Sequence, residues 1–522
     1  MKEEFELVAK TFHGLEEVLA KELTELGASN IEIGNRMVAF TGDKALMYKA
    51  NFCLRTAIRI LKPIKHFKAN NADEVYDNIK SIAWENYLDN TKSFAVDAVV
   101  FSNEFRHSKF VAYKVKDAIV DYFRDKTGDR PSVRINNPDV LLNIHIAEDR
   151  CTLSLDSSGE SLHRRGYRQE AVEAPLNEVL AAGMILMTGW KGECDLIDPM
   201  CGSGTIPIEA ALIARNIAPG VFRKEFAFEK WVDFDQDLFD SIYNDDSAER
   251  EFNHTIYGYD NNPKANEIAT HNVKAAGLSK EIILKLQPFQ QFEQPKEKSI
   301  IITNPPYGER ISTDDLLGLY KMIGERLKHA FVGNDAWILS YRDECFDEIG
   351  LKPSIKTPLY NGALECQFRK YQMFDGKYKA FRSDNEGKEF KPRKEKSRRP
   401  RRNGDKPEGK RGFKKDFDGK KKFGESFNEE QFLATYGMLT GTASTGIILL
   451  RQIDPKLETP ASTNLVFQTL WACLTGFPLL LLMGFVPRSL TWCFIALGIF
   501  VVALIAFYGW IRLAAKKVAR DR

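Results

Sequence analysis

The sequence predicts a multidomain α/β protein in which an N-terminal α+β region precedes a doubly wound, Rossmann-like domain and a membrane helical hairpin. Over residues 1–160, short strand-like runs such as FELVAKT and RMVAFTG alternate with amphipathic helices. Over residues 170–375, apolar strands such as CDLIDP and SIIITNPP alternate with helices, which is typical of a doubly wound sheet. Beyond residue 460, two uncharged stretches (464–486 and 490–511) are long enough to cross ~30 Å of hydrocarbon.

The N-terminal region is predicted to comprise two small α+β units, residues 1–50 and residues 51–165. In the first, the segment GLEEVLAKELTEL repeats apolar residues at helical spacing. In the second, FVAYKVKDAIVDYFRDKTG predicts a helix that is apolar on one face and carries lysines near its start. Positive charge beside aromatic residues suits contact with structured RNA, and an ordinary solvated face is the alternative for each residue. The candidate RNA-binding residues are Arg106, His107, Lys109, Lys114, Lys116, Arg164, Arg165 and Arg168.

A glycine-rich loop between a buried strand and a helix is the first candidate ligand site. In the stretch DLIDPMCGSGTIPIEAALIARNIAPG, the strand ends at Asp198 and Pro199, and the helix opens at Ile206. Glycines let the backbone approach a ligand closely, and the helix start offers unpaired N–H groups. Such a loop suits a phosphate or the amino-acid part of S-adenosylmethionine. The second is favoured, because the sequence completes neither the G-x-G-x-x-G spacing of dinucleotide binders nor the Lys-Ser/Thr pair of a P-loop.

The next strand of this domain ends in an acid, in the stretch IYGYD. In nucleotide-binding sheets an acid at this place accepts hydrogen bonds from both ribose hydroxyls, and this is the role that we predict for Asp260. Asp260 lies far beyond the usual ~20-residue offset from the loop, because the segment 219–254 intervenes. The alternative role is an N-cap of the following helix, NPKANEIATHNVKAAG.

The stretch TNPPYGER follows the apolar run KSIIIT and forms a stiff, non-helical corner at the end of a later strand. Such strand ends lie on the rim where doubly wound sheets bind ligands. The side-chain oxygen of Asn304 and the carbonyl of Pro305, held outward by the Pro305-Pro306 pair, can accept both hydrogens of a base amino group. The nitrogen lone pair, otherwise drawn into the ring, is then free to take a methyl group by positioning and electrostatics. Tyr307 offers a face on which the target base can stack.

Three kinds of methyl transfer fit this corner, because guanine N2, adenine N6 and glutamine N5 are all planar nitrogens. The RNA-like N-terminal region and the basic segment argue against a protein glutamine. A binding module without catalytic activity leaves both the glycine loop and the corner unexplained. We therefore predict an enzyme that acts on RNA, with adenine N6 as the alternative target.

Residues 1–375 resemble the THUMP-domain RNA methyltransferases, in particular the bacterial 23S ribosomal RNA guanine-N2 methyltransferases. The resemblance is carried by DPMCGSGTIPIEAALIARNIAPG, GYDNNPKA, TNPPYGER and KTPLYNGALECQFRKY, and upstream by EFRHSKFVAYKVKDAIVDYFRDKTGDRPSV and SLDSSGESLHRRGYR. It implies a THUMP RNA-binding domain at 51–165, a class I methyltransferase domain at 166–375, and ribosomal RNA as the substrate. It implies catalytic roles for Asn304, Pro305, Pro306 and Tyr307. It implies that S-adenosylmethionine binds near Asp198, Pro199, Met200, Gly202, Ser203, Gly204, Thr205, Asp260, Asn261 and Asn304.

The sequence departs from that family in one place. Where such enzymes often have an acid that holds the adenine amino group, this chain reads KLQPFQQF. Phe289 is a candidate to stack on the adenine of the cofactor, and Gln290 is a weaker candidate for a contact.

The distribution of charge separates this part of the chain from its tail. The 522 residues contain 74 Lys and Arg against 72 Asp and Glu. Residues 377–422 hold 20 of the basic residues and 8 of the acidic ones, so residues 376–425 are predicted to be a disordered basic linker. The N-terminus, MKEEFELVAKTF, lacks the apolar core of a signal peptide, and the first 375 residues are expected to be cytoplasmic.

The cysteines give no sign of a metal site or of a disulfide framework. They are scattered, without a C-x-x-C pair or a His/Cys spacing that suits zinc, and we predict no bound metal. The eight are Cys53, Cys151, Cys194, Cys201, Cys345, Cys366, Cys473 and Cys493.

The last hundred residues belong to a different class of protein. The stretch FLATYGMLTGTASTGIILLRQIDP and the two apolar stretches after it resemble the C-terminal end of bacterial sodium/glutamate symporters. Its small and hydroxyl-bearing residues suit a broken membrane segment beside an ion or substrate path, or else a polar turn before a helix. Only a fragment of that family is present, so transport is not expected. Residues 426–522 are predicted to anchor the enzyme to the inner (cytoplasmic) membrane, as a natural fusion or as an artefact of the gene model.

Overall fold

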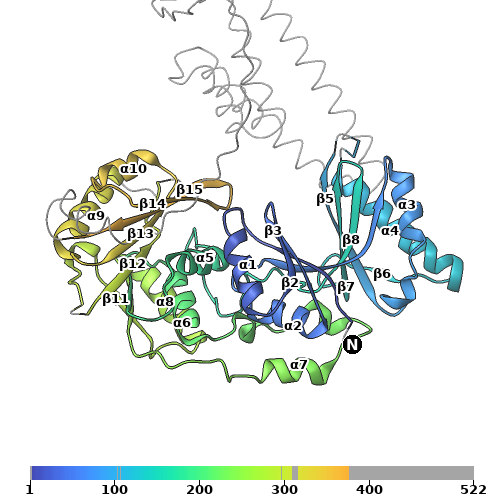
Figure 1. Ribbon diagram of the computed structural model, residues 1–522, viewed down its shortest axis with the longest axis horizontal. Coiled ribbons are helices and arrows are strands. Elements are labelled where there is room, and N and C mark those ends of the chain that lie inside the picture. Colours follow the sequence, from blue (N-terminus) through green and yellow to red (C-terminus); the bar gives the residue numbers. More distant parts are fainter. Residues whose placement is uncertain (1–2, 103, 106, 296, 309–314, 375–522) are drawn as a thin grey trace, which may run out of the picture. The chain divides into compact units, whose positions relative to one another are not determined.

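The computed structural model describes residues 3–374 except 103, 106, 296 and 309–314 (Figure 1). These residues form two sheets with their accompanying helices. The predicted basic linker (376–425) and the predicted membrane segment (426–522) lie outside the described residues. Within the described part, no helix is both long enough and apolar enough to cross a membrane.

Among the described residues, the first sheet has eight strands in the order β2-β3-β1-β4-β8-β7-β5-β6. β4 pairs with β1 on one side and with β8 on the other, so the sheet continues across the predicted boundary between residues 50 and 51. Alternate residues of β7 are buried, because one face of this strand lies on the core. The strands are β1 (Phe5–Lys10), β2 (Ser29–Gly34), β3 (Met37–Gly42), β4 (Arg59–Lys68), β5 (Ser93–Phe101), β6 (Ser132–Val133), β7 (Val140–Ala147) and β8 (Arg150–Asp156).

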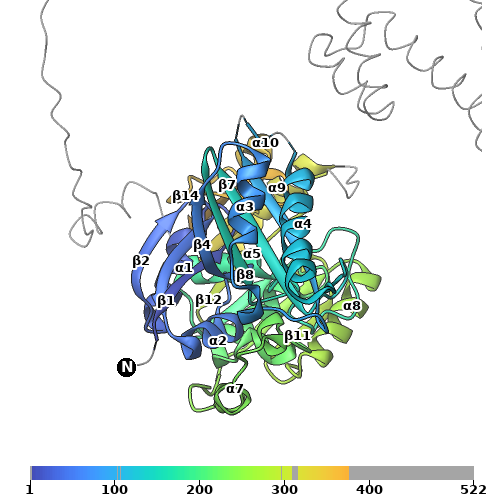
Figure 2. The same ribbon diagram turned by 90° about the vertical axis from the view of Figure 1, so that its right-hand side faces the viewer.

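In the same part of the chain, four α-helices accompany this sheet. α3 and α4 lie side by side next to β5 and β7, as both views show (Figures 1 and 2). The side chain of Asn71 accepts hydrogen bonds from the N–H groups of Asp73 and Glu74 and so caps the start of α3. The helices are α1 (Glu16–Glu25), α2 (Lys44–Cys53), α3 (Ala72–Lys80) and α4 (Ser108–Thr127), with a 3₁₀ turn at Trp84–Asn86.

The second sheet has seven strands within the described residues, in the order β11-β10-β9-β12-β13-β15-β14. The first five are parallel, and β15 is antiparallel to both β13 and β14. β9 and β12 are buried along their whole length, as expected for strands covered on both faces. The prediction of a doubly wound, Rossmann-like domain is confirmed. The strands are β9 (Asp195–Asp198), β10 (Ile256–Asp260), β11 (Ile282–Leu286), β12 (Ser299–Thr303), β13 (Asp335–Ser340), β14 (Ile355–Asn361) and β15 (Leu364–Gln372).

The helices of this second part begin at side-chain caps and at the glycine loop. Asn177 caps the start of α5, and Asn262 caps the start of α8. α6 begins directly after Gly204, whose left-handed backbone (φ +81°) an L side chain rarely adopts. The helices are α5 (Glu178–Thr188), α6 (Thr205–Arg215), α7 (Gln236–Tyr243), α8 (Pro263–Ala275), α9 (Leu316–Ala330) and α10 (Asp343–Glu348), with 3₁₀ turns at Pro219–Phe222, Ala227–Lys230 and Phe289–Gln291.

The inserted segment 219–254 packs on α2, beside the first sheet (Figure 1). Phe228, which is fully buried, stacks on Tyr48 with 4.3 Å between ring centroids. Phe239 meets both rings edge-on, at 5.1 Å from Phe228 and 5.9 Å from Tyr48. The insertion therefore shares a hydrophobic core with the N-terminal region. Because it leaves and rejoins the second sheet, Asp260 is distant from the glycine loop in sequence although β10 pairs with β9.

Candidate active site

Three neighbouring strands of the second sheet carry the predicted site at their carboxyl ends. β9 lies between β10 and β12, and later strands extend the sheet outward on both sides. In such folds the crevice at this switch point binds ligands. β9 ends at Asp198, β10 ends at Asp260, and Asn304 follows the end of β12. The fold thus brings the three predicted regions to one edge of the sheet.

The glycine loop (residues 199–204) is a tight turn between β9 and α6. Gly202 and Gly204 have positive φ angles of 54° and 81°. A β-carbon on Gly204 would lie 3.3 Å from the β-carbon of Ala269 in α8, which is a tight contact, and the positive φ further disfavours any L side chain there. A β-carbon on Gly202 would meet only Val172, at 3.9 Å, so space remains beside the loop at that residue.

Asp198 connects β9 to β12. It is 1% exposed, and the Thr303 hydroxyl donates to its Oδ1 over 2.9 Å. Burial raises the pKa of Asp198 to about 7, and the nearby Asp260 carboxylate adds to this increase. The neighbouring Cys201 thiol is also buried, which raises its pKa well above the usual value. Asp198 therefore positions the strand end that precedes Asn304.

Asp260 holds the glycine loop through the backbone. Its Oδ2 accepts the N–H of Gly202 over 2.9 Å, and its Oδ1 accepts the N–H of Asn262 over 2.9 Å. The N-cap of α8 is Asn262, whose side chain accepts the N–H groups of Lys264 and Ala265. The alternative role for Asp260, as the cap of this helix, is therefore wrong. Its carboxylate is partly exposed at the rim, where the predicted ribose contact stays open.

In the corner after β12, the side chains of Asn304 and Tyr307 are bonded to each other. Asn304 is partly exposed, but its side-chain Oδ1 accepts a hydrogen bond from the Tyr307 hydroxyl. The Tyr307 side chain is 9% exposed, and its ring packs edge-on against Tyr341 with 5.6 Å between centroids. Burial raises the pKa of Tyr307 well above its usual value. The predicted stacking face and the predicted amino-group acceptor are thus engaged with groups of the protein itself.

Phe289, the predicted stacking partner for adenine, lies in the core. It is 3% exposed and packs against Phe331 with 5.5 Å between ring centroids. Gln290 beside it is exposed. A stacking role for Phe289 is not available in this geometry, because its ring fills the core between the sheet and α9.

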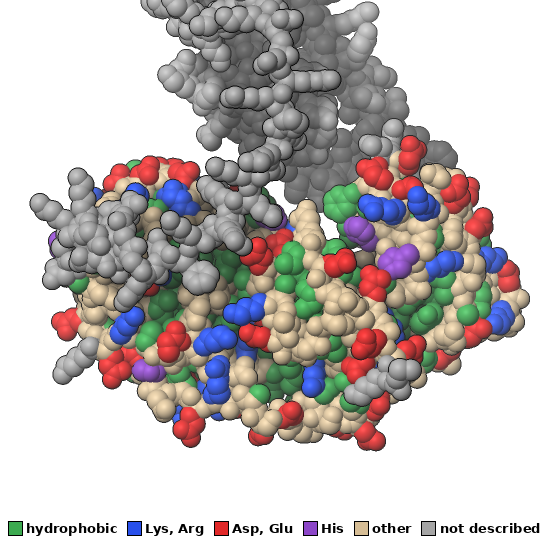
Figure 3. Space-filling view, in the orientation of Figure 1, with side chains coloured by type: hydrophobic (Ala, Val, Ile, Leu, Met, Phe, Trp, Pro, Cys, Tyr) green, Lys and Arg blue, Asp and Glu red, His purple; other side chains and the backbone are tan. Residues whose placement is uncertain are grey.

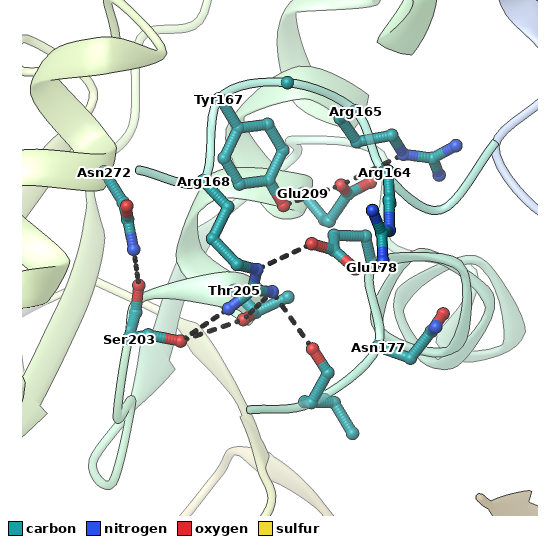
Figure 4. Close-up of polar contacts among 12 residues, drawn as sticks. Arg164, Arg165, Tyr167, Arg168, Asn177, Glu178, Ser203, Thr205, Glu209 and Asn272 are labelled. Atoms are coloured by element: carbon teal, nitrogen blue, oxygen red, sulfur yellow. Dashed lines mark hydrogen bonds and ion pairs between the residues drawn. The ribbon is translucent and has the colours of Figure 1, made fainter. Parts of the chain in front are cut away.

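The arginines of the stretch HRRGYR face in different directions (Figure 4). Arg164 is 67% exposed and pairs with Glu160. Arg165 is 2% exposed, and its guanidinium donates to the carbonyls of Leu162 and Arg55 and pairs with Glu209 at 3.4 Å. The structure therefore contradicts an RNA contact for Arg165, which instead fastens the N-terminal region to α6.

Arg168 is also directed into the protein. Its side chain is 17% exposed and bonds to Glu178 and to the hydroxyls of Ser203 and Thr205. The sequence predicted that Arg168 binds RNA and that Ser203 and Thr205 contact the cofactor. In the structure these three side chains bond to one another, so the RNA assignment of Arg168 is wrong.

The remaining predicted RNA-binding residues are on the surface, mostly beside acids. Lys114 pairs with Asp73 and Lys116 with Asp117, each over 2.9 Å. His107 and Lys109 are exposed, and Arg106 lies outside the described residues. On the face drawn in Figure 3, basic and acidic side chains are interspersed. Lys114 and Lys116 line a pocket of about 360 Å³. Its other charged or aromatic lining residues are Tyr76, Asp117, Asp121, Arg124 and Arg130, which the sequence did not single out.

The sequence did not indicate the buried polar residues that support the glycine loop and the start of α6. Asn272 of α8 is 1% exposed; it donates to the Ser203 carbonyl over 3.0 Å and accepts from the Gln169 N–H over 2.9 Å. Tyr167 donates to Glu209 over 2.9 Å, and burial raises the pKa of both groups. No local pattern marks Asn272 or Glu209, because each lies on an otherwise ordinary helix face.

One group of described residues has the side-chain types of a metal site. Asp195, His254 and Glu297 each offer a ligand atom within 4.8 Å of the others. They lie near the starts of strands β9, β10 and β12, at the opposite end from the glycine loop. His254 Nδ1 is 3.7 Å from a carboxylate oxygen of Asp195 and 3.5 Å from one of Glu297, and this buried nitrogen has no hydrogen-bond partner within the described residues.

Three family profiles match successive parts of the chain. A profile described as an RlmL ferredoxin-like domain matches residues 6–61, and a THUMP domain matches residues 69–156. A profile described as an RMKL-like methyltransferase domain matches residues 165–370.

Relatives with known names match the same part of the chain. The Synechocystis protein slr0064, named provisionally as an RNA methyltransferase, is 40% identical over 369 residues, which are 70% of this chain and 96% of that protein. The ribosomal RNA large subunit methyltransferase K/L of Syntrophotalea carbinolica is 38% identical over 379 residues, which are 70% of this chain and 53% of that protein. The chain thus spans about half the length of the K/L relative.

Solved structures share the fold. SMU.472, named provisionally as a methyltransferase and solved with SAH, has a TM-score of 0.65 at 32% identity and covers 72% of this chain and 100% of its own. A Listeria monocytogenes protein, named as a predicted N6-adenine-specific DNA methylase, has a TM-score of 0.64 at 32% identity and covers 71% of this chain and 97% of its own. TrmN from Thermus thermophilus shares the fold at 18% identity, with a TM-score of 0.53.

Proposed function

Since the chain belongs to the RMKL-like methyltransferase family, we propose that it transfers a methyl group from S-adenosylmethionine to an exocyclic amino group of ribosomal RNA. The observation that carries this proposal is the arrangement at the rim of the second sheet. The glycine loop and the corner at Asn304 follow adjacent strands, and the Thr303 hydroxyl joins them through Asp198 over 2.9 Å. A cofactor on the loop and a base at the corner would therefore be neighbours.

The cofactor assignment rests on the chemistry of the loop and on one relative. The loop has room beside Gly202, and Asp260 presents a partly exposed carboxylate next to it, as a nucleoside with free ribose hydroxyls requires. SMU.472 was solved with SAH, the demethylated form of S-adenosylmethionine. When bound, S-adenosylmethionine supplies an electrophilic methyl group on sulfur. The residues proposed to hold it are Asp198, Pro199, Met200, Gly202, Ser203, Gly204, Thr205, Asp260, Asn261 and Asn304.

The proposed work of the corner is to hold the target amino group. The Asn304 Oδ1 and the Pro305 carbonyl would accept its two hydrogens, which makes the nitrogen lone pair available for attack. The rigid Pro305-Pro306 unit holds the Pro305 carbonyl in place, so this acceptor requires little rearrangement in the transition state. For this the Tyr307 hydroxyl has to release Asn304, because it occupies the same oxygen. Stacking on the base also requires the Tyr307 ring, which is 9% exposed, to leave its contact with Tyr341.

RNA is the proposed substrate class, with guanine N2 of 23S ribosomal RNA as the proposed target. The support is the match of residues 69–156 to a THUMP domain and the names of the K/L relatives. Exposed His107, Lys109 and Arg164 are the proposed RNA contacts, with Lys114 and Lys116 beside them. The Listeria protein is named as an adenine-N6 methylase, so adenine N6 is the alternative target that an experiment has to exclude.

The test is to identify the methylated nucleoside. The full-length chain is incubated with unmodified ribosomal RNA and S-adenosylmethionine, and the RNA is digested and analysed by mass spectrometry. We expect N2-methylguanosine. N6-methyladenosine would contradict the guanine assignment and leave the corner mechanism in place, whereas methylated protein in a parallel reaction would contradict RNA as the substrate.

For the tail, we propose a membrane anchor. Residues 464–486 and 490–511 are uncharged, and Pro487, Arg488 and Ser489 join them. Basic residues precede the first stretch and follow the second, which favours a helical hairpin with both ends in the cytoplasm. The methyltransferase would then remain in the compartment where ribosomes are assembled.

A further inference from the structure

Arg168 lies next to the glycine loop. Figure 4 shows its side chain between Glu178 on one side and Ser203 and Thr205 on the other. Its NH1 donates to the Ser203 hydroxyl over 2.8 Å, and its NH2 donates to the Thr205 hydroxyl over 2.9 Å. These two residues flank Gly204, the residue with a left-handed backbone that directly precedes α6. One planar guanidinium therefore spans the turn at which the loop becomes a helix.

The electrostatics of a helix N-terminus disfavour a cation at the start of α6. The start of a helix carries partial positive charge, so a guanidinium beside α6 is unfavourable unless other groups hold it. Glu178 supplies that hold, because its carboxylate, in a side chain 7% exposed, accepts from Arg168 Nε over 2.7 Å. The Leu176 carbonyl accepts a further N–H over 3.1 Å. The position of Arg168 is thus fixed by partners outside the loop.

The backbone around Arg168 is fixed as well. Two residues earlier in the chain Gly166 has a φ of 114°, and a β-carbon there would lie 2.1 Å from the Phe222 carbonyl oxygen. On the other side, the Gln169 N–H donates to Asn272, which also holds the Ser203 carbonyl over 3.0 Å. Ser203 therefore accepts one hydrogen bond from Arg168 at its hydroxyl and another from Asn272 at its carbonyl.

We propose that Arg168 is the positioning residue for the cofactor loop. It sets the angle between the loop and the first turn of α6 without touching the reacting atoms. This inference rests on the proposed binding of S-adenosylmethionine to that loop. Lysine cannot replace it, because an ammonium group on a flexible stem does not present two fixed donors to two hydroxyls while also bonding Glu178.

The test compares cofactor and RNA binding by the full-length chain and its Arg168→Gln variant. We expect the Kd and KM for S-adenosylmethionine to rise roughly 10- to 100-fold, as expected for lost bonds from a charged group. The Kd for ribosomal RNA and the kcat at saturating cofactor should change little. Arg168→Lys should restore only a small part of the loss. Lys191→Gln is the control, since this exposed cation (52%) has no proposed role in either binding site, and it should leave both cofactor and RNA binding unchanged.

A double-mutant cycle separates positioning from a general loss of structure. If Arg168 acts through Ser203, Arg168→Gln should weaken cofactor binding much less in a Ser203→Ala background than in the wild type. Glu178→Gln carries the test if Arg168→Gln does not fold, because it weakens the bond that holds Arg168 and lies outside the loop, and it should then raise the Kd for the cofactor. Unchanged cofactor binding together with weaker RNA binding in Arg168→Gln would overturn the inference. If the wild-type chain itself failed to bind the cofactor, the proposed function would be the part overturned.

Discussion

At the residue scale, the rim of the second sheet combines a buried acid with a partly exposed one. Burial raises the pKa of Asp198 to about 7, and its carboxyl group bonds to Thr303. Asp260, at the end of the next strand, is partly exposed and accepts two backbone N–H groups. The first acid therefore serves the strand ends, and the second remains available to a ligand.

Asn304→Ala should abolish methyl transfer and leave most cofactor binding intact. Removing one preorganised acceptor from a reacting centre typically costs about 10²–10³ in rate. The kcat on ribosomal RNA and the Kd for S-adenosylmethionine are the quantities to measure. A turnover within a few fold of the wild type would contradict the role of the corner.

Asp260→Ala should weaken cofactor binding more than RNA binding. Loss of a charge-assisted bond to a ribose typically costs roughly 1.5–3 kcal/mol. The control is Asn262→Ala, which removes the cap of α8 and should lower stability by about 1 kcal/mol without a comparable effect on the cofactor. Calorimetric titration distinguishes the two, and equal losses of affinity would point to a purely structural role for Asp260.

Tyr307→Phe should keep or raise the activity, and Tyr307→Ala should lower it. The phenylalanine retains a ring for stacking but removes the hydroxyl that occupies the Asn304 oxygen. Base–aromatic stacking is typically worth about 1–3 kcal/mol, so the alanine variant should lose roughly 5- to 150-fold in kcat/KM for RNA. If phenylalanine and alanine were equally damaging, the hydroxyl itself would be the important group.

At the element scale, the site depends on how three strands and one helix are tied together. β9 and β12 are joined by the Asp198–Thr303 bond, β10 reaches the loop through Asp260, and α6 is joined to the N-terminal region by Arg165. Each tie uses a buried or half-buried polar group. Such groups cost free energy unless they are bonded, so they specify one arrangement of these elements.

Asp198 should make the second sheet less stable as the pH rises. Its pKa of about 7 in the folded chain lies above the usual 3.8, so between about pH 4 and pH 7 the folded chain holds a proton that the unfolded chain has released. The free energy of unfolding therefore falls across that window and levels off above it. Asp198→Asn stays neutral and can still accept from Thr303, so it should lack this fall and be more stable at pH 8, by on the order of a few kcal/mol.

The measurement is the thermal unfolding midpoint of both chains at pH 5 and pH 8, without cofactor. Titration of all other groups is common to the two chains and cancels in the comparison. Parallel changes in the two midpoints would show that Asp198 is ionised in the folded chain at pH 5.

At the scale of the whole molecule, the first sheet and the second sheet are joined by segments that also serve the site. The stretch 157–177 leaves β8 and reaches α5, and on the way it contacts α6 and the glycine loop. The insertion 219–254 leaves the second sheet and packs on α2. The N-terminal region is therefore joined to the glycine loop both through the chain and through packed contacts.

The tail gives a prediction at the same scale. The full-length chain, 1–522, should appear in the membrane fraction, because its two uncharged stretches are long enough to span the bilayer. A chain of residues 1–375 should appear in the supernatant and still bind S-adenosylmethionine. A full-length chain that is monodisperse without detergent would contradict the anchor, and loss of cofactor binding in the shorter chain would show that the tail contributes to the enzyme.

The sequence by itself determined the class of the second domain and the regions of its site. A strand, a glycine loop and a helix are contiguous in the chain, and so are a strand and its Pro-Pro corner, so local patterns suffice to find them. Because neighbouring strands in a parallel sheet run in the same direction, the carboxyl ends of these strands lie at one edge of the sheet. For the same reason Asp260 could be placed at this edge despite the insertion before it.

Only the tertiary structure decided which way individual side chains face. The stretch HRRGYR has no helical or strand periodicity, so nothing local states that Arg164 faces solvent while Arg165 and Arg168 face inward. Phe289 looked like a stacking partner and is a core residue, because α9 covers it from a distant part of the chain. Whether a side chain is buried depends on every segment that packs around it, and these segments can be distant in sequence. The residues next to it in the chain therefore do not determine its burial.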